Sequence, residues 1–252
     1  MELSHLEFTG KASTALAFVS LAENGERTFS FCRKPSADLL YAPEQIDPGW
    51  FSQAFALHFC SVSLVDSPMR YAHLAAITAA REAGAILSFD PNLRFPLWPD
   101  REQLRQTVWQ FLPLSHILKL SDEELPFLTG TEDIEAALPR LFTGDVQLVL
   151  FTCGSKGARA YTRTASARAR SPKVTAVDTT GAGDGFIGSF LWQLQRDSVT
   201  AAELPKLSRK RLTEYLTFSN RFCAISVQRH GALDSYPTLE QMEQPEADFP
   251  LL

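Results

Sequence analysis

Residues 173–196 read KVTAVDTTGAGDGFIGSFLWQLQR. The first five of them predict a strand, and apolar residues recur at helical spacing from Phe186 onward. The polar turn between these two elements brings Gly181 and Asp184 to the N-terminus of the helix. Free backbone N–H groups and the positive end of the helix dipole attract anions there, and glycines let a ligand approach closely. The stretch predicts a phosphate site made of backbone.

The carboxylate of Asp184 in this anion-attracting turn has two interpretations. It could accept the proton of an attacking hydroxyl, or it could stabilise the helix N-terminus by ~0.3–1 kcal/mol. A dinucleotide site is a further alternative, because Gly183, Gly185 and Gly188 fit G-x-G-x-x-G. That fit is weak, since no strand with an acidic end follows about 20 residues later. The chain has no G-x-x-x-x-G-K-[ST], which excludes a P-loop.

The N-terminal part of the chain predicts a small β element. Residues 13–19 and 27–32 predict two strands, joined by a hairpin through Asn24-Gly25. We take 1–37 as this element and its lead-in.

The remainder, 38–252, predicts an α/β body. A helix is expected to begin at the N-cap Ser67 and the N1 residue Pro68 and to end at Gly84. Short apolar runs with little alternation predict strands buried on both faces, at 55–60, 85–89, 116–120 and 147–152. This alternation of helices and strands predicts a doubly wound, mostly parallel sheet.

Composition limits the classes of function. The 252 residues are 45% hydrophobic and carry a formal net charge of −5, which argues against nucleic-acid and membrane-surface partners. No apolar run approaches the ~20 residues that span a bilayer, and the first residues do not resemble a secretory signal. Four scattered cysteines without C-x-x-C predict reduced thiols in a cytoplasmic protein.

The stretch DTTGAGD at 178–184, followed by an apolar helix, resembles the C-terminal signature of the ribokinase-like (PfkB) sugar kinases, and within them bacterial fructokinases. Further segments agree with that family in order, namely GERTFSFCRKPSAD (25–38), SFDPNLRFPLWP (88–99), KLSDEELPFLTG (119–130), LVLFTCGSKGARAYT (148–162) and SNRFCAISVQRHGALDSYPT (219–238). The resemblance implies a ribokinase-like fold and transfer of the γ-phosphoryl group of ATP to a sugar hydroxyl, with fructose the expected sugar. It also implies Mg²⁺ and, in many members, K⁺. A kinase of 2-keto-3-deoxygluconate, ribose or nucleosides is an alternative within the same fold.

The resemblance also implies residue roles at the transferred phosphate. Asp184 matches the catalytic base, and Glu124 matches a glutamate that orders Mg²⁺ through water, with Ser121 where the family usually has asparagine. The anion hole is matched by Gly181, Ala182 and Gly183, and the polar pair near the transferred phosphate by Asn92 and Arg94.

Two further sets of residues match the nucleotide and cation sites. The loop and helix beside ATP correspond to Thr152, Gly154, Lys156, Gly157 and Asn220. The monovalent-cation site corresponds to Asp178, Thr180, Ser226, Gly231 and Ser235.

Each of these matches has a structural alternative. Ser121 and Glu124 also form an S-x-x-E capping box, and residues 90–92 also form a good turn. Arg94 could pair with a surface carboxylate. Lys156 could be a solvated loop residue, and Asn220 a satisfied helix residue.

The family's N-terminal strand with its sugar-binding aspartate, and the glycine–asparagine motif after it, have no match here, and the first agreement lies near Ser13. The resemblance therefore implies an N-terminally truncated member. A catalytically impaired fragment or decayed kinase, which only binds nucleotide or a partner, is the main alternative. A homodimer is expected through an apolar lid face of Ala17, Val19, Phe29 and Phe31.

Overall fold

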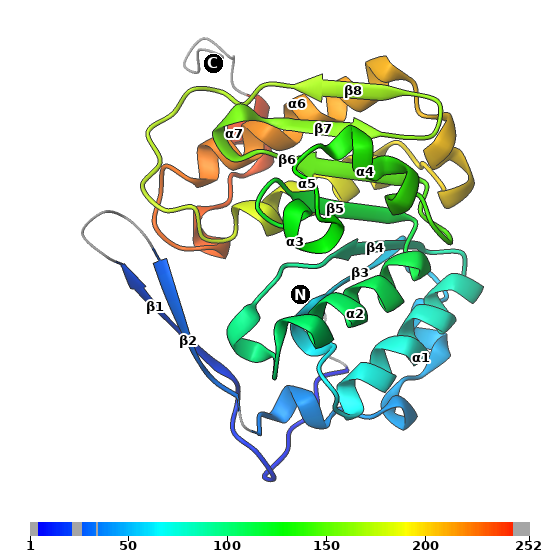
Figure 1. The fold of residues 1–252 in the computed structure, drawn as a ribbon, viewed down its shortest axis with the longest axis vertical. Helices are drawn as coiled ribbons and strands as arrows, with labels where there is room; N and C mark the ends of the chain where they lie inside the picture. The colour runs from blue at the N-terminus through cyan, green and yellow to red at the C-terminus, as the bar shows by residue number, and fades with distance from the viewer. Residues whose placement is uncertain (1–4, 22–26, 34, 244–252) are drawn as a thin grey trace.

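The computed structural model describes residues 5–21, 27–33 and 35–243. Within them a six-stranded sheet has the order β3-β4-β5-β6-β7-β8, and a two-stranded hairpin stands apart from it (Figure 1). The strands of the larger sheet are β3 (Ala56–Cys60), β4 (Ile86–Asp90), β5 (Ile117–Ser121), β6 (Leu148–Thr152), β7 (Ala158–Tyr161) and β8 (Ser166–Ala169). The four predicted strands of the body are thereby confirmed.

The sheet is parallel from β3 to β6, and its last two pairings, β6–β7 and β7–β8, are antiparallel. The sequence pattern did not predict β7 and β8. The links before them, 153–157 and 162–165, are too short for the crossover that a parallel pairing needs, so the chain turns back on itself. The result is a mixed α/β sheet in which the parallel strands form the centre.

Helices cover both faces of the sheet (Figure 1). One layer contains α1 (Pro68–Glu82), α2 (Arg101–Phe111), α3 (Leu125–Thr129) and α4 (Ile134–Leu141), and the other contains α5 (Ala182–Arg196) and α6 (Arg209–Ser226). A last helix, α7, spans Leu239–Glu243. Short 3₁₀ segments lie at Ala37–Leu40, Pro43–Gln45, Pro48–Phe51, Ser61–Ser63, Phe95–Leu97, Leu112–Leu114, Gly154–Lys156, Ala201–Lys206 and Leu233–Ser235.

Each central strand supplies two separate cores, because successive side chains point to opposite faces. Leu118 and Leu120 of β5 pack with α1 to α4, whereas Ile117 packs with α5 and α6. By the same alternation Lys119 lies on the α5/α6 face, and so does Asp90 at the end of β4. Two charged side chains therefore lie on this face next to the start of α5, where His58 of β3 and Ser88 of β4 also form a polar pair at 3.0 Å.

Helix α1 has the predicted bounds, with Ser67 as its N-cap residue and Gly84 in the left-handed region at φ 81°. The predicted side-chain cap is wrong. The Ser67 hydroxyl donates to the Val65 carbonyl at 3.1 Å, because the turn before the helix already uses it.

The hairpin consists of β1 (Leu16–Leu21) and β2 (Arg27–Cys32), paired antiparallel as predicted. The register places residue 17 opposite 31 and residue 19 opposite 29, so these four positions share one face. On the other face, Leu16 and Phe18 are 53% and 55% exposed. The expected Asn24-Gly25 turn lies outside the described residues.

The predicted strand at 173–177 is wrong. In the described part of the chain no strand runs beside this segment, and without a partner an extended segment forms no ladder. Its end is held instead by the Val227 carbonyl, which accepts from the amides of Val177 and Asp178 at 2.7 and 3.1 Å. The helix expected after it begins at Ala182. None of the helices in the described ranges combines the length and the apolar character that crossing a membrane requires.

Gly157 is a position at which a larger side chain should be costly. Its φ is 93°, and a Cβ atom there would lie 2.2 Å from the Ala169 carbonyl oxygen. We expect Gly157→Ala to lower the free energy of unfolding by at least the ~1–3 kcal/mol of such backbone strain, measured by urea titration. Gly188→Ala is the control, because its Cβ meets nothing within 4 Å and alanine should stabilise helix α5 by ~0.5–1 kcal/mol. Equal stability of the two variants would contradict this account.

Candidate active site

A cavity of about 430 Å³ lies at the carboxyl ends of β5 and β6 and against the first turn of α5. In parallel α/β sheets, ligands bind outside the carboxyl ends of the strands. The cavity brings together six residues predicted for the nucleotide and phosphate sites, namely Thr152, Gly154, Gly157, Ala182, Gly183 and Asn220. Lys156 is exposed and does not line it, in agreement with the solvated-loop alternative.

The first turn of α5 offers unpaired backbone donors. Gly181, at φ 76°, precedes the helix, and the Ala182 amide donates to the Thr179 carbonyl at 3.2 Å. Among the described residues, no backbone acceptor pairs with the amides of Gly183 and Asp184. These two amides, rather than that of Ala182, are the donors available to an anion.

The side chain of Asp184 is exposed and is not packed into the interior. Gly183 lines the cavity at the strand ends, while Asp184 lines an adjoining apolar cavity of about 320 Å³ together with Trp192 and Tyr236. Asp184 therefore lines the second cavity and directly follows a residue that lines the first. That position suits a group that acts on one ligand lying next to another.

A buried charge pair lies beneath this turn. The Lys119 ammonium lies 2.5 Å from Oδ2 of Asp90, and both side chains are buried. Burial alone would lower the pKa of Lys119, but the carboxylates of Asp90, Glu124 and Asp184 raise it, so the group is charged. Burial raises the pKa of Asp90 to about 6, against the lowering effect of Lys119. Sequence reasoning missed Lys119, although a lysine inside the apolar run ILKLS was a usable signal.

The Glu124 carboxylate makes the reciprocal bonds of the capping-box alternative. Its Oε2 accepts from the amide and hydroxyl of Ser121 at 3.0 Å, and the Glu124 amide donates to the Ser121 hydroxyl at 3.3 Å. Its Oε1 accepts from the Leu93 amide at 2.9 Å, which ties the loop after β4 to the loop after β5. Asn92, at φ 50°, and Arg94, which donates to the Leu93 carbonyl at 3.0 Å, do not line the cavity.

Asn220 of α6 is buried, and its Nδ2 donates to the carbonyls of Ala169 and Arg170 at 3.1 and 3.2 Å. The Asn220 side chain therefore has its hydrogen bonds made within the protein, as the structural alternative for this residue predicted. It also lines the cavity, and it joins α6 to the end of β8.

The five residues predicted for a monovalent cation gather beside the turn before α5. Oδ1 of Asp178 accepts from the amide and hydroxyl of Thr180 at 2.9 and 2.7 Å, and Oδ2 accepts from the Gly231 amide at 3.0 Å. The buried hydroxyls of Ser226 and Ser235 lie 2.7 Å apart. The Val227 carbonyl next to Ser226 binds the Asp178 amide, so the two groups adjoin.

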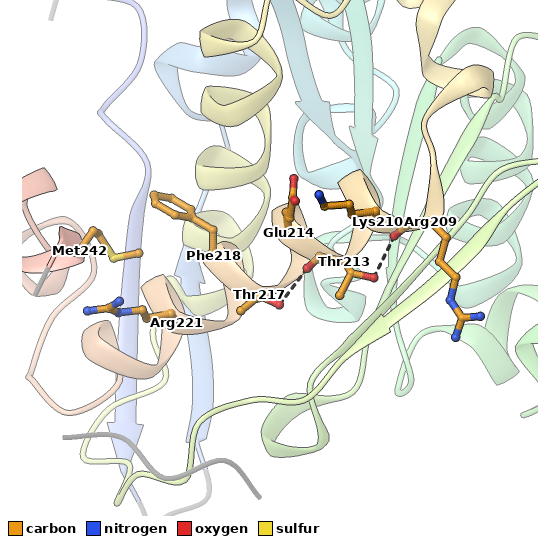
Figure 2. Close-up of a pocket in the computed structure, with 8 residues that line it drawn as sticks. All are labelled: Arg209, Lys210, Thr213, Glu214, Thr217, Phe218, Arg221 and Met242. Carbon is orange, nitrogen blue, oxygen red and sulfur yellow. Dashed lines mark hydrogen bonds between the residues drawn. The ribbon is translucent and has the colours of Figure 1, made fainter. Parts of the chain in front are cut away.

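A larger groove of about 650 Å³ runs along the outer surface of α6 (Figure 2). Its charged side chains do not converge, since Arg209 and Arg221 lie at opposite ends of it. We therefore place the candidate active site at the strand ends.

Comparison with known proteins agrees with this site. The model of the pfkB family carbohydrate kinases matches residues 2–239, and the match begins upstream of Ser13, where we expected the first agreement. The chain is 41% identical over 240 residues to "Probable fructokinase-4" of Arabidopsis thaliana, covering 94% of this chain and 72% of that protein.

Two solved structures are similar over most of the chain. A fructokinase of Xylella fastidiosa with bound ATP has a TM-score of 0.85 and 37% identity, and the match covers 93% of this chain and 73% of that one. A fructokinase of Vibrio cholerae O395 with fructose, ADP and calcium has a TM-score of 0.82 and 34% identity, with coverage of 95% and 75%. These similarities and the family match have one consequence: the chain belongs to the pfkB family of carbohydrate kinases, as its glycine-rich turn predicted.

Proposed function

We propose that this chain is an ATP-dependent fructokinase. The observation that carries the proposal is the exposed carboxylate of Asp184 at the start of helix α5. It directly follows Gly183, which lines the cavity at the strand ends and whose amide has no backbone partner among the described residues. The bound ATP of the Xylella relative and the fructose and ADP of the Vibrio relative support the two substrates.

In the proposed reaction, Asp184 accepts the proton of the attacking sugar hydroxyl. A carboxylate is a much weaker base than an alkoxide and does not remove that proton beforehand. The transfer therefore comes late, as the new P–O bond forms and the bond from the phosphoryl group to ADP breaks in a loose transition state. The amides of Gly183 and Asp184 stabilise the charge on the phosphoryl oxygens, and one such donor contributes ~2.7–4 kcal/mol. Of the anion hole proposed from Gly181, Ala182 and Gly183, Gly183 supplies a free amide, whereas the Ala182 amide is bound to the Thr179 carbonyl. Arg94 and Asn92 keep the proposed role of groups near the transferred phosphate.

Mg²⁺ is the cation proposed for this reaction, where it would neutralise charge on the phosphate oxygens. The described residues hold no cluster of three or more metal-binding side chains, which suits a cation held mainly by phosphates and water. Glu124 would hold it through water. The buried Oδ1 of Asp90 has no hydrogen-bond partner within the described ranges, which fits a ligand-borne donor such as water at this place.

The lid and the location of the protein remain proposals. Residues 1–37 act as the lid over the sugar and 38–252 as the body, and the apolar register face of the hairpin supports a homodimer through that lid. All four cysteines are free, which supports the cytoplasm as its compartment.

The carboxylate of Asp184 provides the first test. We expect Asp184→Asn to lower kcat roughly 10²- to 10⁴-fold through loss of the base, while ATP binding stays largely intact, measured by ADP release and by calorimetry. Glu102→Gln is the control, because Glu102 is also a first-turn carboxylate, in α2, outside the site. A normal kcat for Asp184→Asn would support the helix-stabilising alternative, and ATP binding without turnover in the unmodified chain would support the non-catalytic one.

The choice of sugar is tested by comparing fructose, ribose, 2-keto-3-deoxygluconate and a nucleoside at matched ATP. We expect fructose to give the highest kcat/KM, because differences in kcat/KM report differential binding of the transition state. A preference for any of the other three would replace fructose as the substrate.

The cation site is tested through Asp178. We propose that K⁺ binds among the oxygens of Asp178, Thr180, Ser226, Gly231 and Ser235. The unmodified chain should then turn over several-fold faster in KCl than in NaCl at equal ionic strength. Asp178→Asn should be slower and indifferent to the choice of salt, because the carboxylate that attracts the ion is gone. Equal rates of the unmodified chain in both salts would refute a K⁺ site.

A further inference from the structure

Lys119 carries a buried ammonium group at the base of the candidate active site. Its side chain comes from the middle of β5, on the face that packs against α5 and α6, and it lines the cavity at the strand ends. Only 6% of the residue is exposed. Burying an ammonium is costly unless it is paired, so a specific role for this charge must be sought.

The ammonium faces the first turn of α5 directly. A Cβ atom built on Gly183 would lie 3.1 Å from Nζ of Lys119, and no other side chain or backbone atom beyond this lysine lies within 4 Å of it. Gly183 is not in the left-handed backbone region, so the close approach of the ammonium is what a larger side chain would disturb at this position. An anion bound by the Gly183 amide would therefore lie next to Nζ.

A phosphate ligand needs a positive group in this cavity, because most of the charged groups around it are carboxylates. Asp122 and Glu123 line the cavity, and the carboxylates of Asp90, Glu124 and Asp184 are close enough to act on Lys119. Of the described residues that line this cavity, Lys119 is the one with a basic side chain. Without it, an incoming polyphosphate would meet carboxylates with only helix amides to offset them.

A purely structural charge pair would not need this position. Replacing a buried ion pair by apolar residues of similar shape is often neutral or stabilising, so stability alone gives little reason to keep Lys119 and Asp90. The ammonium has three donors, and Asp90 Oδ2 takes one at 2.5 Å. The remaining donors lie on a ligand cavity.

We propose that Lys119 is a catalytic residue that binds the transferred phosphoryl group, and that Asp90 is a positioning residue that holds its ammonium against the first turn of α5. This inference rests on the proposed phosphotransferase function. Lysine binds phosphate as a point charge, and here it strengthens its hold as charge spreads over the phosphoryl oxygens in the transition state.

The experiment measures nucleotide binding by calorimetry, with a non-hydrolysable ATP analogue and with ADP. We expect Lys119→Met to weaken binding of the analogue about tenfold or more, and binding of ADP by threefold or less. The loss for the analogue is that of a hydrogen bond to a charged group. The kcat of this variant should fall roughly 10²- to 10³-fold, as for loss of a transition-state donor. Asp90→Asn should lower kcat with a smaller change in affinity, because the ammonium stays but is held less firmly.

A double variant, Lys119→Met with Asp90→Asn, protects the test against misfolding, because it leaves no buried charge unpaired. If it unfolds at the temperature of the unmodified chain and still loses selectivity for the analogue, the proposal stands. Lys206→Met is the matched control on an exposed lysine of Ala201–Lys206 and should bind both nucleotides normally. Normal analogue binding and a normal kcat in the double variant would overturn the role proposed for Lys119 but leave the proposed function standing. An unmodified chain that binds neither nucleotide would overturn the proposed function itself, and this inference with it.

Discussion

The packing of α5 against the central strands is the constraint on which the site depends. Phe186, Phe190 and Leu194 of the helix pack with Ile117 and Leu148 of the sheet in one buried core. Burying one large apolar side chain stabilises by ~1.5–3 kcal/mol, so these residues together contribute more than the ~1.5–3 kcal/mol of one hydrogen bond to a charged group. This core sets where the helix begins, and so it places two unpaired amides beside the carboxyl ends of β5 and β6.

The polar residues of the site take their positions from that arrangement. Asp90 and Lys119 end up on the same face of neighbouring strands and pair at 2.5 Å, below the first turn of α5. Glu124 ties the loop after β4 to the loop after β5 by accepting from Leu93 and Ser121. The buried charges of Asp90 and Lys119 are thereby paired, and the Glu124 carboxylate is hydrogen-bonded, as buried polar groups must be.

Patterns in short stretches of sequence predicted much of this structure, because interactions between residues close in the chain determine it. The buried strands, the bounds of α1 and the start of α5 follow from apolar periodicity, a proline at the first helical position and the glycine-rich turn. The strand expected at 173–177 failed because a strand exists only with a neighbour, and periodicity carries no information about neighbours. The antiparallel turn-back into β7 and β8 was missed for the same reason.

The α/β class, the glycine-rich turn with its carboxylate at a helix start, and the family could all be predicted from the sequence. The folded structure was needed to show which donors are free, that Asp184 lines a cavity next to the one at the strand ends, and that Lys119 faces Gly183. The reason is physical: hydrogen-bond satisfaction and charge pairing depend on distances between residues far apart in the chain. Those distances are set by how the two cores pack, which no short stretch of sequence encodes.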